Sequence, residues 1–577
     1  MKKKLALIFS ILFLVVTSGY LYIRYGLLKT KEFKPDNSKA KNVLDLRPSI
    51  IAKLQQLVKE GSDGLYLLSI EKLDVDVLDS KLNFNNASIT IDTAAMEQLE
   101  KLKKLPDDIF KIKFTSLHIE GIGIQDLLNK GKIDISGILL NDPVIEVFHK
   151  SRPYNKTKRK TNETLSLYKK LKGQVQSIKI GRINIVRGTF INDNVAKKNC
   201  ITRFNDISIT IQDLLIDSTT QYDNNRFLFA KHTVIECKKY LYPTRDSLYF
   251  FKVGSITIAG EQRKIVASDV EFKPRLSKQQ FESKLSTRKN MYHLTFPRVV
   301  LSNVNWWEMM NHEKFIAKEV EITNGIFYDY LDKSLPPKPY IKIDNFPQQM
   351  LMKIPVPLSL SKLTLRHLDV AYEELNPAIK KSAIISFNNI NGIITHISNI
   401  PAEIKQSNHI NFSGKGLFMH KVAMTAKLTL DLSKYRTGEF IADVHMDTLN
   451  KTIVNTIAEP LELFSIRKGE MQQATAHVEG NNFTTKGTIE FYYTNLNVTL
   501  LKKDSGEDGK LKKKKVTSFL ANTFLIKDSN PLTGEDPRKP EFSVDRAKYG
   551  TFFKFVLVSV LTGILKTIGI PVKLVLK

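Results

Sequence analysis

The chain of 577 residues is poor in several residue types, and each shortage excludes a class of protein. Two cysteines, Cys200 and Cys237, are too few for a disulfide-dense scaffold or a zinc site of four thiolates. They can form one bridge between strands or remain two core thiols. Only 27 glycines and 21 prolines exclude collagen-like and low-complexity material. Acidic residues number 59 against 87 Lys and Arg, and this net charge of +28 favours anionic surfaces as partners.

Motifs that carry catalysis or metal binding are also missing. The chain has no HExxH, no GxSxG, no P-loop and no GxGxxG after a strand. Its 11 histidines are scattered, and no further ligands flank His232 and Cys237. We therefore expect no catalytic residue, no metal site, no cofactor and no enzyme activity. The positive charge comes without a zinc-finger, helix-turn-helix or RNP pattern, so nucleic acid is not expected as a partner.

One long hydrophobic run is present, and it lies at the N-terminus. Leu5 to Ile23 carries no charge, follows three lysines and is closed by Arg24. This length of helix reaches roughly 28 Å, close to the hydrocarbon thickness of a bilayer. A cleaved signal peptide would begin in the same way, but no A-x-A site follows the run. We expect an uncleaved transmembrane anchor, with lysines on both sides that leave its orientation open.

Between residues 65 and 500 the apolar residues recur with a period of two. Examples are Tyr66, Leu68 and Ile70, and later Leu428 and Leu430. This period indicates strands with one apolar face and one largely polar face. Short helices are expected at 49–59, 93–104, 162–171 and 447–458. Asp447 would cap the last of these helices, and Pro460 would end it.

Two short patterns repeat along these strands. Three segments share a Phe-Asn start: Phe84–Ile91, Phe204–Ile211 and Phe387–Ile394. The second pattern begins with two apolar residues that are two positions apart. A small or apolar residue follows three positions further on, and another apolar residue comes after it. Its copies are Ile183–Phe190, Val299–Trp306, Val320–Phe327 and Leu363–Val370, with looser ones that begin at Leu117 and Ile138. The starts at 117 and 138, like those at 299 and 320, are 21 residues apart, which suits two strands and their turns.

These patterns predict a mainly β fold. We expect an elongated, curled, quasi-repetitive antiparallel sheet, or β-groove, with a few short helices and the N-terminal transmembrane helix. A pair of β-sandwiches is the alternative. An amphipathic sheet must cover its apolar face, and a curled sheet can instead leave an apolar trough that a ligand fills. The candidates for the lining of such a trough are Ile183, Ile185, Val320, Ile322, Leu363 and Leu365.

Two further segments carry predictions. The stretch from Tyr549 to Ile570 is apolar except for Lys554 and Lys566, and the uncharged part between these lysines is too short to span a bilayer. We expect an interfacial amphipathic helix with both lysines at a membrane surface, or alternatively a buried helix that closes the sheet. The neighbouring tryptophans at 306 and 307 are expected on a strand, with one in the core and one at an edge.

The chain resembles the AsmA-like family of Gram-negative envelope proteins, which are relatives of TamB and of bridge-like lipid-transfer proteins. The resemblance rests on the anchor, the Phe-Asn strand starts and several segments, most of them in the last third: Leu140–Ile145 (LNDPVI), Met446–Leu449 (MDTL), Ile466–Met471 (IRKGEM), Gly487–Val498 (GTIEFYYTNLNV), Ala521-Asn522, Asn530-Pro531 and Phe552-Phe553. It implies a single-pass inner-membrane protein whose bulk is periplasmic. It also implies a groove for phospholipid acyl chains in outer-membrane maintenance, with envelope proteins as further partners. The alternative is a membrane-tethered structural or regulatory scaffold for outer-membrane protein assembly.

The patterns and the resemblance together divide the chain into seven parts. The division runs 1–25 transmembrane anchor, 26–64 linker and short helix, 65–150 N-terminal β-repeat region, 151–174 basic linker and short helix, 175–445 central β-repeat region, 446–546 C-terminal AsmA-like region, and 547–577 apolar amphipathic C-terminal segment.

Overall fold

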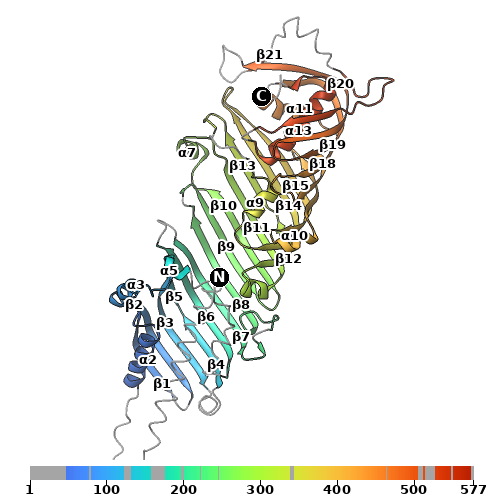
Figure 1. Cartoon of the computed structure of the whole chain (residues 1–577). Helices are drawn as coiled ribbons and strands as arrows, with labels where there is room; N and C mark the ends of the chain where they lie inside the picture. The colour runs from blue at the N-terminus through green and yellow to red at the C-terminus, as the bar shows by residue number, and fades with distance from the viewer. Residues whose placement is uncertain are drawn as a thin grey trace, which may run out of the picture. The chain divides into compact units, whose positions relative to one another are not determined.

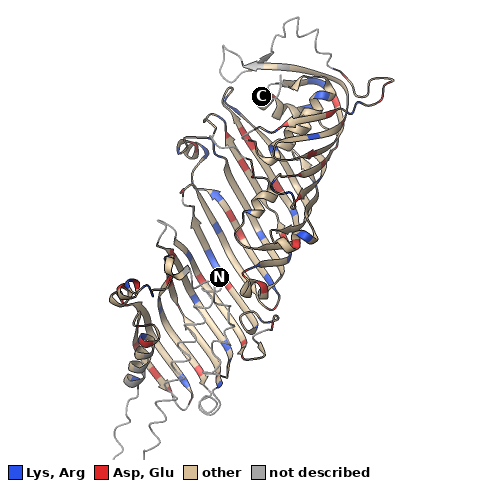
Figure 2. Ribbon diagram, viewed as in Figure 1, with Lys and Arg blue, Asp and Glu red and all other residues tan. Residues whose placement is uncertain are grey.

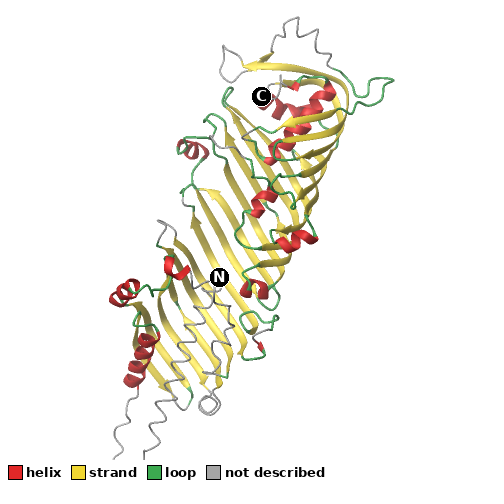
Figure 3. Cartoon of the chain, in the orientation of Figure 1, coloured by secondary structure: helices red, strands yellow, loops and turns green. Residues whose placement is uncertain are grey.

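A computed structural model describes most of the chain. The described residues are 47–76, 79–122, 132–156, 176–195, 201–220, 223–244, 246–337, 343–462, 464–503, 511–513, 527–547 and 550–572. The fold is mainly β, with 58% strand against 17% helix, as the alternation predicts. Helices are few and short beside the strands (Figure 3), and charged residues lie along the strands as well as in the turns (Figure 2).

The chain forms two compact units. Unit 1 takes Met1–Arg245, Lys252–Ala267 and Asn303–Glu313, and unit 2 takes Asp246–Phe251, Ser268–Ser302 and Lys314–Lys577. Three strands divide their residues between the units: β9 (Tyr249–Ala259), β10 (Lys264–Pro274) and β11 (Met291–Val304). The seven-part division expected from the sequence stays a prediction.

Unit 1 is built on a sheet in which β1, β2 and β3 are joined as antiparallel neighbours, and β6, β7 and β8 likewise (Figure 1). Its strands are β1 (Tyr66–Asp76), β2 (Lys81–Ile91), β3 (Asp108–Ile122), β4 (Lys132–Asn141), β5 (Val144–His149), β6 (Ser177–Asn194), β7 (Ile201–Ile216) and β8 (Ala230–Pro243). Its helices are α2 (Arg47–Gly61), α3 (Thr93–Lys101), α5 (Pro153–Lys156) and α8 (Trp306–Asn311).

Unit 2 continues with long antiparallel pairs from β14 to β20, and β22 pairs with β20. Its strands are β12 (Phe315–Thr323), β13 (Ile326–Asp332), β14 (Leu358–Asn376), β15 (Lys381–Ser398), β16 (His409–Phe418), β17 (Val422–Asp431), β18 (Phe440–Met446), β19 (Phe464–Gly480), β20 (Thr484–Lys503), β21 (Leu511–Lys513) and β22 (Glu541–Asp545). Its helices are α7 (Lys278–Ser283), α9 (Pro347–Met352), α10 (Pro401–Gln406), α11 (Lys451–Glu462) and α13 (Phe552–Ile568).

The repeated sequence patterns mark residues with left-handed backbone conformation. In the three Phe-Asn segments the third residue has positive φ: Asn86 (47°), Asp206 (50°) and Asn389 (51°). In all six copies of the second pattern the fifth residue does so: Gly121, Asp142, Arg187, Asn303, Asn324 and His367. Asn, Asp, His and Gly are the residues that adopt this conformation most readily, and they occupy all of these positions except that of Arg187.

Four of these residues, Arg187, Asp206, His367 and Asn389, lie at the register shifts of β-bulges. The register between β6 and β7 shifts on both sides of Gly188, and that between β14 and β15 shifts on both sides of Leu368. A bulge inserts one residue, so the step between side chains on one face becomes three there instead of two. Ile183, Ile185, Gly188 and Phe190 thereby share one face, which explains the spacing of the repeated pattern.

Part of the sheet is parallel, so the fully antiparallel sheet expected from the sequence is wrong. In unit 1, β4 and β5 are one strand interrupted at Asp142-Pro143, and both run parallel to β6. The interruption is bridged by hydrogen bonds from Asp142 N to Val186 O (2.9 Å) and from Thr189 N to Pro143 O (2.7 Å). Alternation contains no information on strand direction, because side chains alternate in the same way in both arrangements.

Unit 2 repeats this arrangement. There β12 and β13 are one strand interrupted at Asn324-Gly325, and both run parallel to β14. Asn324 N donates to Arg366 O (2.9 Å), and Asp369 N donates to Gly325 O (2.8 Å). The quasi-repeat of the sequence therefore corresponds to a repeated module of an interrupted strand, a long parallel strand and an antiparallel return.

Several local expectations need correction. Trp306 and Trp307 open the helix α8, which Asn305 caps, and do not lie on a strand. Trp306 is buried, and its Nε1 donates to Gly260 O over 2.7 Å. The helix expected at 447–458 begins later, at Lys451, and continues past Pro460 to Glu462. A proline near the end of a helix interrupts few intrahelical hydrogen bonds, so it does not end the helix there.

Three expectations lie wholly or partly outside the described residues. The anchor from Leu5 to Ile23 and the helix at 162–171 lie outside them altogether. Among the helices that the structure does describe, none combines the length and apolarity needed to cross a bilayer. Cys237 is a buried free thiol, while Cys200 is not among the described residues.

The left-handed bulge residue in β7 yields a stability prediction. Replacing Asp206 by Val puts a β-branched side chain at a φ of 50°, which should lower the free energy of unfolding by about 1–2 kcal/mol. Asp206→Gly should be nearly neutral, because glycine accepts positive φ. Urea unfolding followed by circular dichroism measures both. Ser208→Val, two residues along the same strand, is the control, and an equal loss in Ser208→Val and Asp206→Val would refute the bulge argument.

Candidate apolar binding face

Two adjacent rows of side chains form one face of the unit 2 sheet, called here the apolar face. The cross-strand registers of β12 and of β14 to β20 define both rows. The first row contains Val320, Leu363, Ile394, Phe412, Leu428, Ala442 and Val478. The second contains Ile322, Leu365, Gly392, Gly414, Ala426, Val444, Ala476 and Ile489.

The burial of this face changes along the rows. At the β18–β20 end the side chains are buried: Ala442 is 4% exposed, and Val478 and Ile489 are 0% exposed. Toward β12 and β14 the side chains of Ile322 and Leu365 are only half-buried. The same holds for most of the aliphatic and aromatic residues of the first row between β14 and β17, namely Leu363, Ile394, Phe412 and Leu428. The apolar face is therefore covered at the β18–β20 end and partly open between β14 and β17, while Val320 on β12 is again buried at 6% exposure.

The cover at the closed end is the helix α13, which Figure 1 shows beside β18 to β20. The sequence sets both of its ends: the Thr551 side chain caps the N-terminus, and Gly569 ends the helix with a φ of 86°. Phe552 at its start packs edge-on against Phe346 and Phe440, with both ring centroids 4.9 Å away. This aromatic cluster attaches the beginning of α13 to the sheet and to α9.

The sheet-facing side of α13 carries small and polar residues. The Ser559 and Thr485 hydroxyls lie 2.6 Å apart, and Tyr493 donates a hydrogen bond to Thr567 O (3.2 Å). At Gly563 the backbone comes so close that an added Cβ would lie 2.8 Å from both Ile489 and Phe542. Large apolar residues also face the sheet, since Phe555 and Leu565 are buried, whereas Phe553 on the outer side is 74% exposed. The helix therefore fits its sheet by close approach.

An apolar cavity of about 100 Å³ lies beside the cover, between α11, α13 and strands β18 to β20. Its walls include Leu449, Met471, Phe491, Leu561 and Ile564. Cavities of this size and chemistry stay dry and accept small apolar groups. The closed end of the apolar face thus has unfilled space for a short piece of hydrocarbon.

Further along β14, the apolar side chains are followed by a buried cluster of charged residues. Glu374 is almost buried and lies on the same face as Tyr372, whose hydroxyl donates to it over 2.7 Å. Lys333 forms an ion pair with Glu374, and Lys554 of α13 lies 3.5 Å from it. Burial alone would raise the pKa of Glu374, but Lys554, Lys333 and the hydrogen bonds outweigh burial and lower it. Glu374 therefore links α13 to the sheet electrostatically.

The structure places the six predicted lining residues in two groups. Val320 lies opposite Leu363, and Ile322 opposite Leu365, on the parallel strands β12 and β14. Ile183 and Ile185 lie in unit 1, where they are 1% and 7% exposed and belong to its core. In unit 2, Val320 is also buried at 6% exposure, while Ile322, Leu363 and Leu365 are half-buried and belong to the partly open part of the face. Their role toward lipid stays a prediction.

The two predicted membrane-surface lysines have partners within unit 2. Lys554 is close to Glu374, and the Lys566 ammonium donates to Glu541 O over 3.1 Å. Half of α13, including Phe555 and Leu565, is buried against the sheet, as expected for a helix that closes it. The charge cluster at Glu374 was not anticipated from the sequence. Its local signal is the doublet Glu373-Glu374, which interrupts the alternation within an apolar strand.

The close approach of α13 to the sheet predicts whether Gly563→Ala raises or lowers the free energy of unfolding. In an open helix, Gly563→Ala would stabilise by about 1 kcal/mol through helix propensity. Here the added methyl group overlaps Ile489 and Phe542, so we expect a net loss of about 1–3 kcal/mol in the free energy of unfolding. Chemical unfolding gives the value, with the partly exposed Leu557→Ala as control. A gain of stability in Gly563→Ala would mean that α13 does not pack this way.

The Glu374 cluster leads to a prediction of pH dependence. Because its folded pKa is lowered, Glu374 stabilises the fold above the unfolded pKa of about 4.5, and this contribution disappears as pH falls through the folded value. Glu374→Gln should therefore cost about 1–3 kcal/mol near neutral pH and much less in acid. Unfolding measured across this range checks it. Glu439→Gln breaks an exposed pair with Lys434 and should change stability by less than about 1 kcal/mol. A cost that does not vary with pH would contradict the assignment.

No protein-family model and no curated protein matches this chain.

Proposed function

We propose that unit 2 binds phospholipid acyl chains along its apolar face. The observation that carries the proposal is the change along one row of side chains, from fully buried at Val478 to half-buried at Leu363. Half-exposed aliphatic rows across several neighbouring strands leave a contiguous apolar surface, which soluble proteins rarely expose without a ligand or partner. An extended acyl chain suits such a surface, because each buried CH₂ group contributes about 0.8 kcal/mol.

The surroundings of the face agree with an apolar ligand that has an anionic head. The apolar cavity beside α13 extends the hydrocarbon environment at the covered end. The chain as a whole carries a net charge of +28, which attracts anionic lipid. In this proposal Leu5 to Ile23 anchors the protein in an inner membrane, and unit 2 handles lipid in the periplasm for envelope maintenance, as the AsmA-like resemblance implies.

A substitution on the apolar face tests lipid binding. Ile322→Asp places a carboxylate among half-buried aliphatic side chains, where an unpaired charge is strongly unfavourable next to hydrocarbon. We expect at least a tenfold drop in co-purified phospholipid, measured by mass spectrometry of full-length protein purified without delipidation. Thr323→Asp, the next residue on β12 and on the opposite face, should retain lipid. Circular dichroism shows that both variants fold.

Three outcomes count against the proposal. Wild-type protein that is reproducibly free of lipid contradicts it, and so does an equal lipid content in Ile322→Asp and wild type. Lipid-free protein with a stoichiometric protein companion would favour the alternative, a membrane-tethered scaffold for outer-membrane protein assembly.

A further inference from the structure

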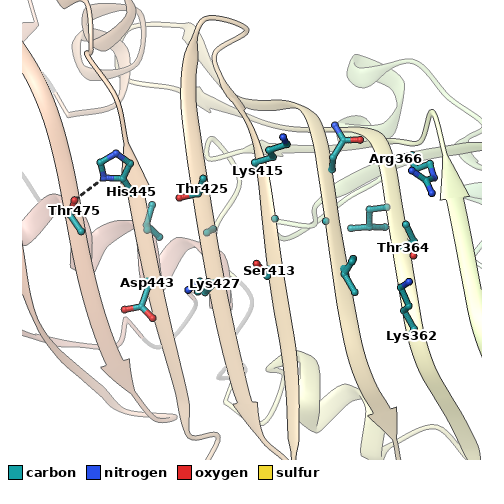
Figure 4. A pocket seen from close by; sticks show the side chains of 17 residues that line it. Lys362, Thr364, Arg366, Ser413, Lys415, Thr425, Lys427, Asp443, His445 and Thr475 are labelled. Carbon is teal, nitrogen blue, oxygen red and sulfur yellow. Dashed lines mark hydrogen bonds between the residues drawn. The ribbon is translucent and has the colours of Figure 1, made fainter.

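The opposite face of the same sheet contains a hollow of about 730 Å³, called here the polar hollow (Figure 4). This volume lies in the range of small-molecule sites, roughly 300–1,000 Å³. Most of the side chains that line it alternate with the apolar rows. Five residues of the second row also border it, namely Leu365, Gly392, Gly414, Ala426 and Val444. Among the lining residues are hydroxyl and amide groups of Thr364, Asn391, Ser413 and Thr425.

The polar hollow carries an excess of positive charge. Lys362, Lys415 and Lys427 line it, and none of the three ammonium groups forms an ion pair or hydrogen bond with any residue that the structure describes. Arg366 is a fourth cation, and Glu321 holds it at 3.0 Å. Three lysines that share one face of three strands repel one another, which is unfavourable for the sheet in the absence of an anion.

The negative charge within the hollow is already engaged. Among its described lining residues the single carboxylate is Asp443, and His477 Nδ1 lies 2.7 Å from it. This contact with Asp443 raises the pKa of the His477 imidazole. His445 Nδ1 contacts the Thr475 hydroxyl over 2.8 Å, as Figure 4 shows. Asp443 is therefore shared with a histidine, and the three lysines remain available to a ligand.

We propose that the polar hollow binds a molecule with two or more phosphate groups. The lysines come from β14, β16 and β17, so their backbones span three strand spacings, or about 14 Å. Linked phosphates carry several negative charges over a comparable length and can contact ammonium groups spread in this way together. Lysine suits this role, because its ammonium is a flexible point charge with three donors. The hydroxyl groups of Thr364, Ser413 and Thr425 supply further donors between the charges.

The small residues Gly392, Gly414 and Ala426 form part of the floor of the hollow. Gly392 pairs with Gly414, which pairs with Ala426, so three neighbouring strands have little side-chain bulk at this level. Their side-chain positions belong to the apolar face, where the Phe412 ring lies beside Gly392 and Gly414. Backbone N–H and C=O groups are committed to the sheet, so recognition depends on the lysines and hydroxyl groups that surround this floor.

Calorimetry with inorganic tripolyphosphate on the full-length protein tests the site. We expect saturable binding that weakens as salt is raised, and orthophosphate should bind at least about tenfold more weakly. Lys415→Gln and Lys427→Gln should each weaken tripolyphosphate binding by about fivefold, since each removes one charge. Lys434→Gln lies in the same unit but is paired with Glu439 outside the hollow, and it should leave the affinity unchanged.

A second experiment, vesicle binding, distinguishes a soluble phosphate ligand from a lipid headgroup. Vesicles of phosphatidylcholine with and without cardiolipin present the same chemistry on a lipid. Lysine-dependent binding of tripolyphosphate alone identifies a soluble ligand, and lysine-dependent binding of cardiolipin vesicles as well identifies a headgroup. Absence of tripolyphosphate binding, or equal affinity in the wild type and the Lys362/Lys415/Lys427 triple glutamine variant, overturns the proposal. The test does not depend on acyl-chain binding, because Ile322→Asp alters the other face and should leave it intact.

Discussion

Keeping the apolar side chains of long strands on one face is the constraint from which the rest of this structure follows. One extra residue in a strand turns all the following apolar side chains to the other face, unless a β-bulge accommodates the extra residue. Here residues such as Asp206, Asn389 and Arg187 do so by adopting positive φ. The bulge thereby restores the alternation of side chains. Ile207 and Ile209 beyond the bulge lie on the same face as Phe204 before it. Bulges also increase strand twist, so the device that preserves the apolar face also bends the sheet.

A continuous apolar face then has to be covered or occupied. In unit 2 the helix α13 covers one end, and it achieves close contact by placing Ser559, Gly563 and Thr567 against the sheet. Phe555, Leu565 and Ile568 are buried beside these small residues and add apolar contact. The Phe346, Phe440 and Phe552 cluster and the ion pair of Lys554 with Glu374 attach it at its first turn. Other helices contact the same sheet, α9 at β17 and α11 at β15 and β19. Half-buried side chains remain toward β12 and β14, at Ile322, Leu363 and Leu365.

The sequence predicted the local alternation of side chains. It did not predict the relative direction of paired strands or the contacts between residues far apart in the chain. The pattern at Val320–Phe327 identified the strand and its apolar face correctly, because alternation is a local property. It could not reveal that β12 and β13 run parallel to β14, since pairing depends on residues about 43 positions away. The tryptophans at 306 and 307 were misplaced on a strand because the strand pattern ends at their border, where Asn305 caps a helix. The pairing of Lys554 with Glu374 joins residues 180 apart, and no local signal predicts it.

The two candidate sites of unit 2 lie on opposite faces of the same strands, which makes them separable. On β14, Thr364 and Arg366 face the polar hollow, and Leu365 between them belongs to the apolar face. A change at one residue therefore alters one face and leaves the next residue's surroundings intact, provided the bulge at His367 keeps the register. The register is held by the Arg366 carbonyl, which accepts from Asn324 N, and by the Asn389 side chain, which contacts His367 Nδ1 over 2.7 Å. The bulge residues thus determine which chemistry each face presents, although none of them belongs to the apolar rows.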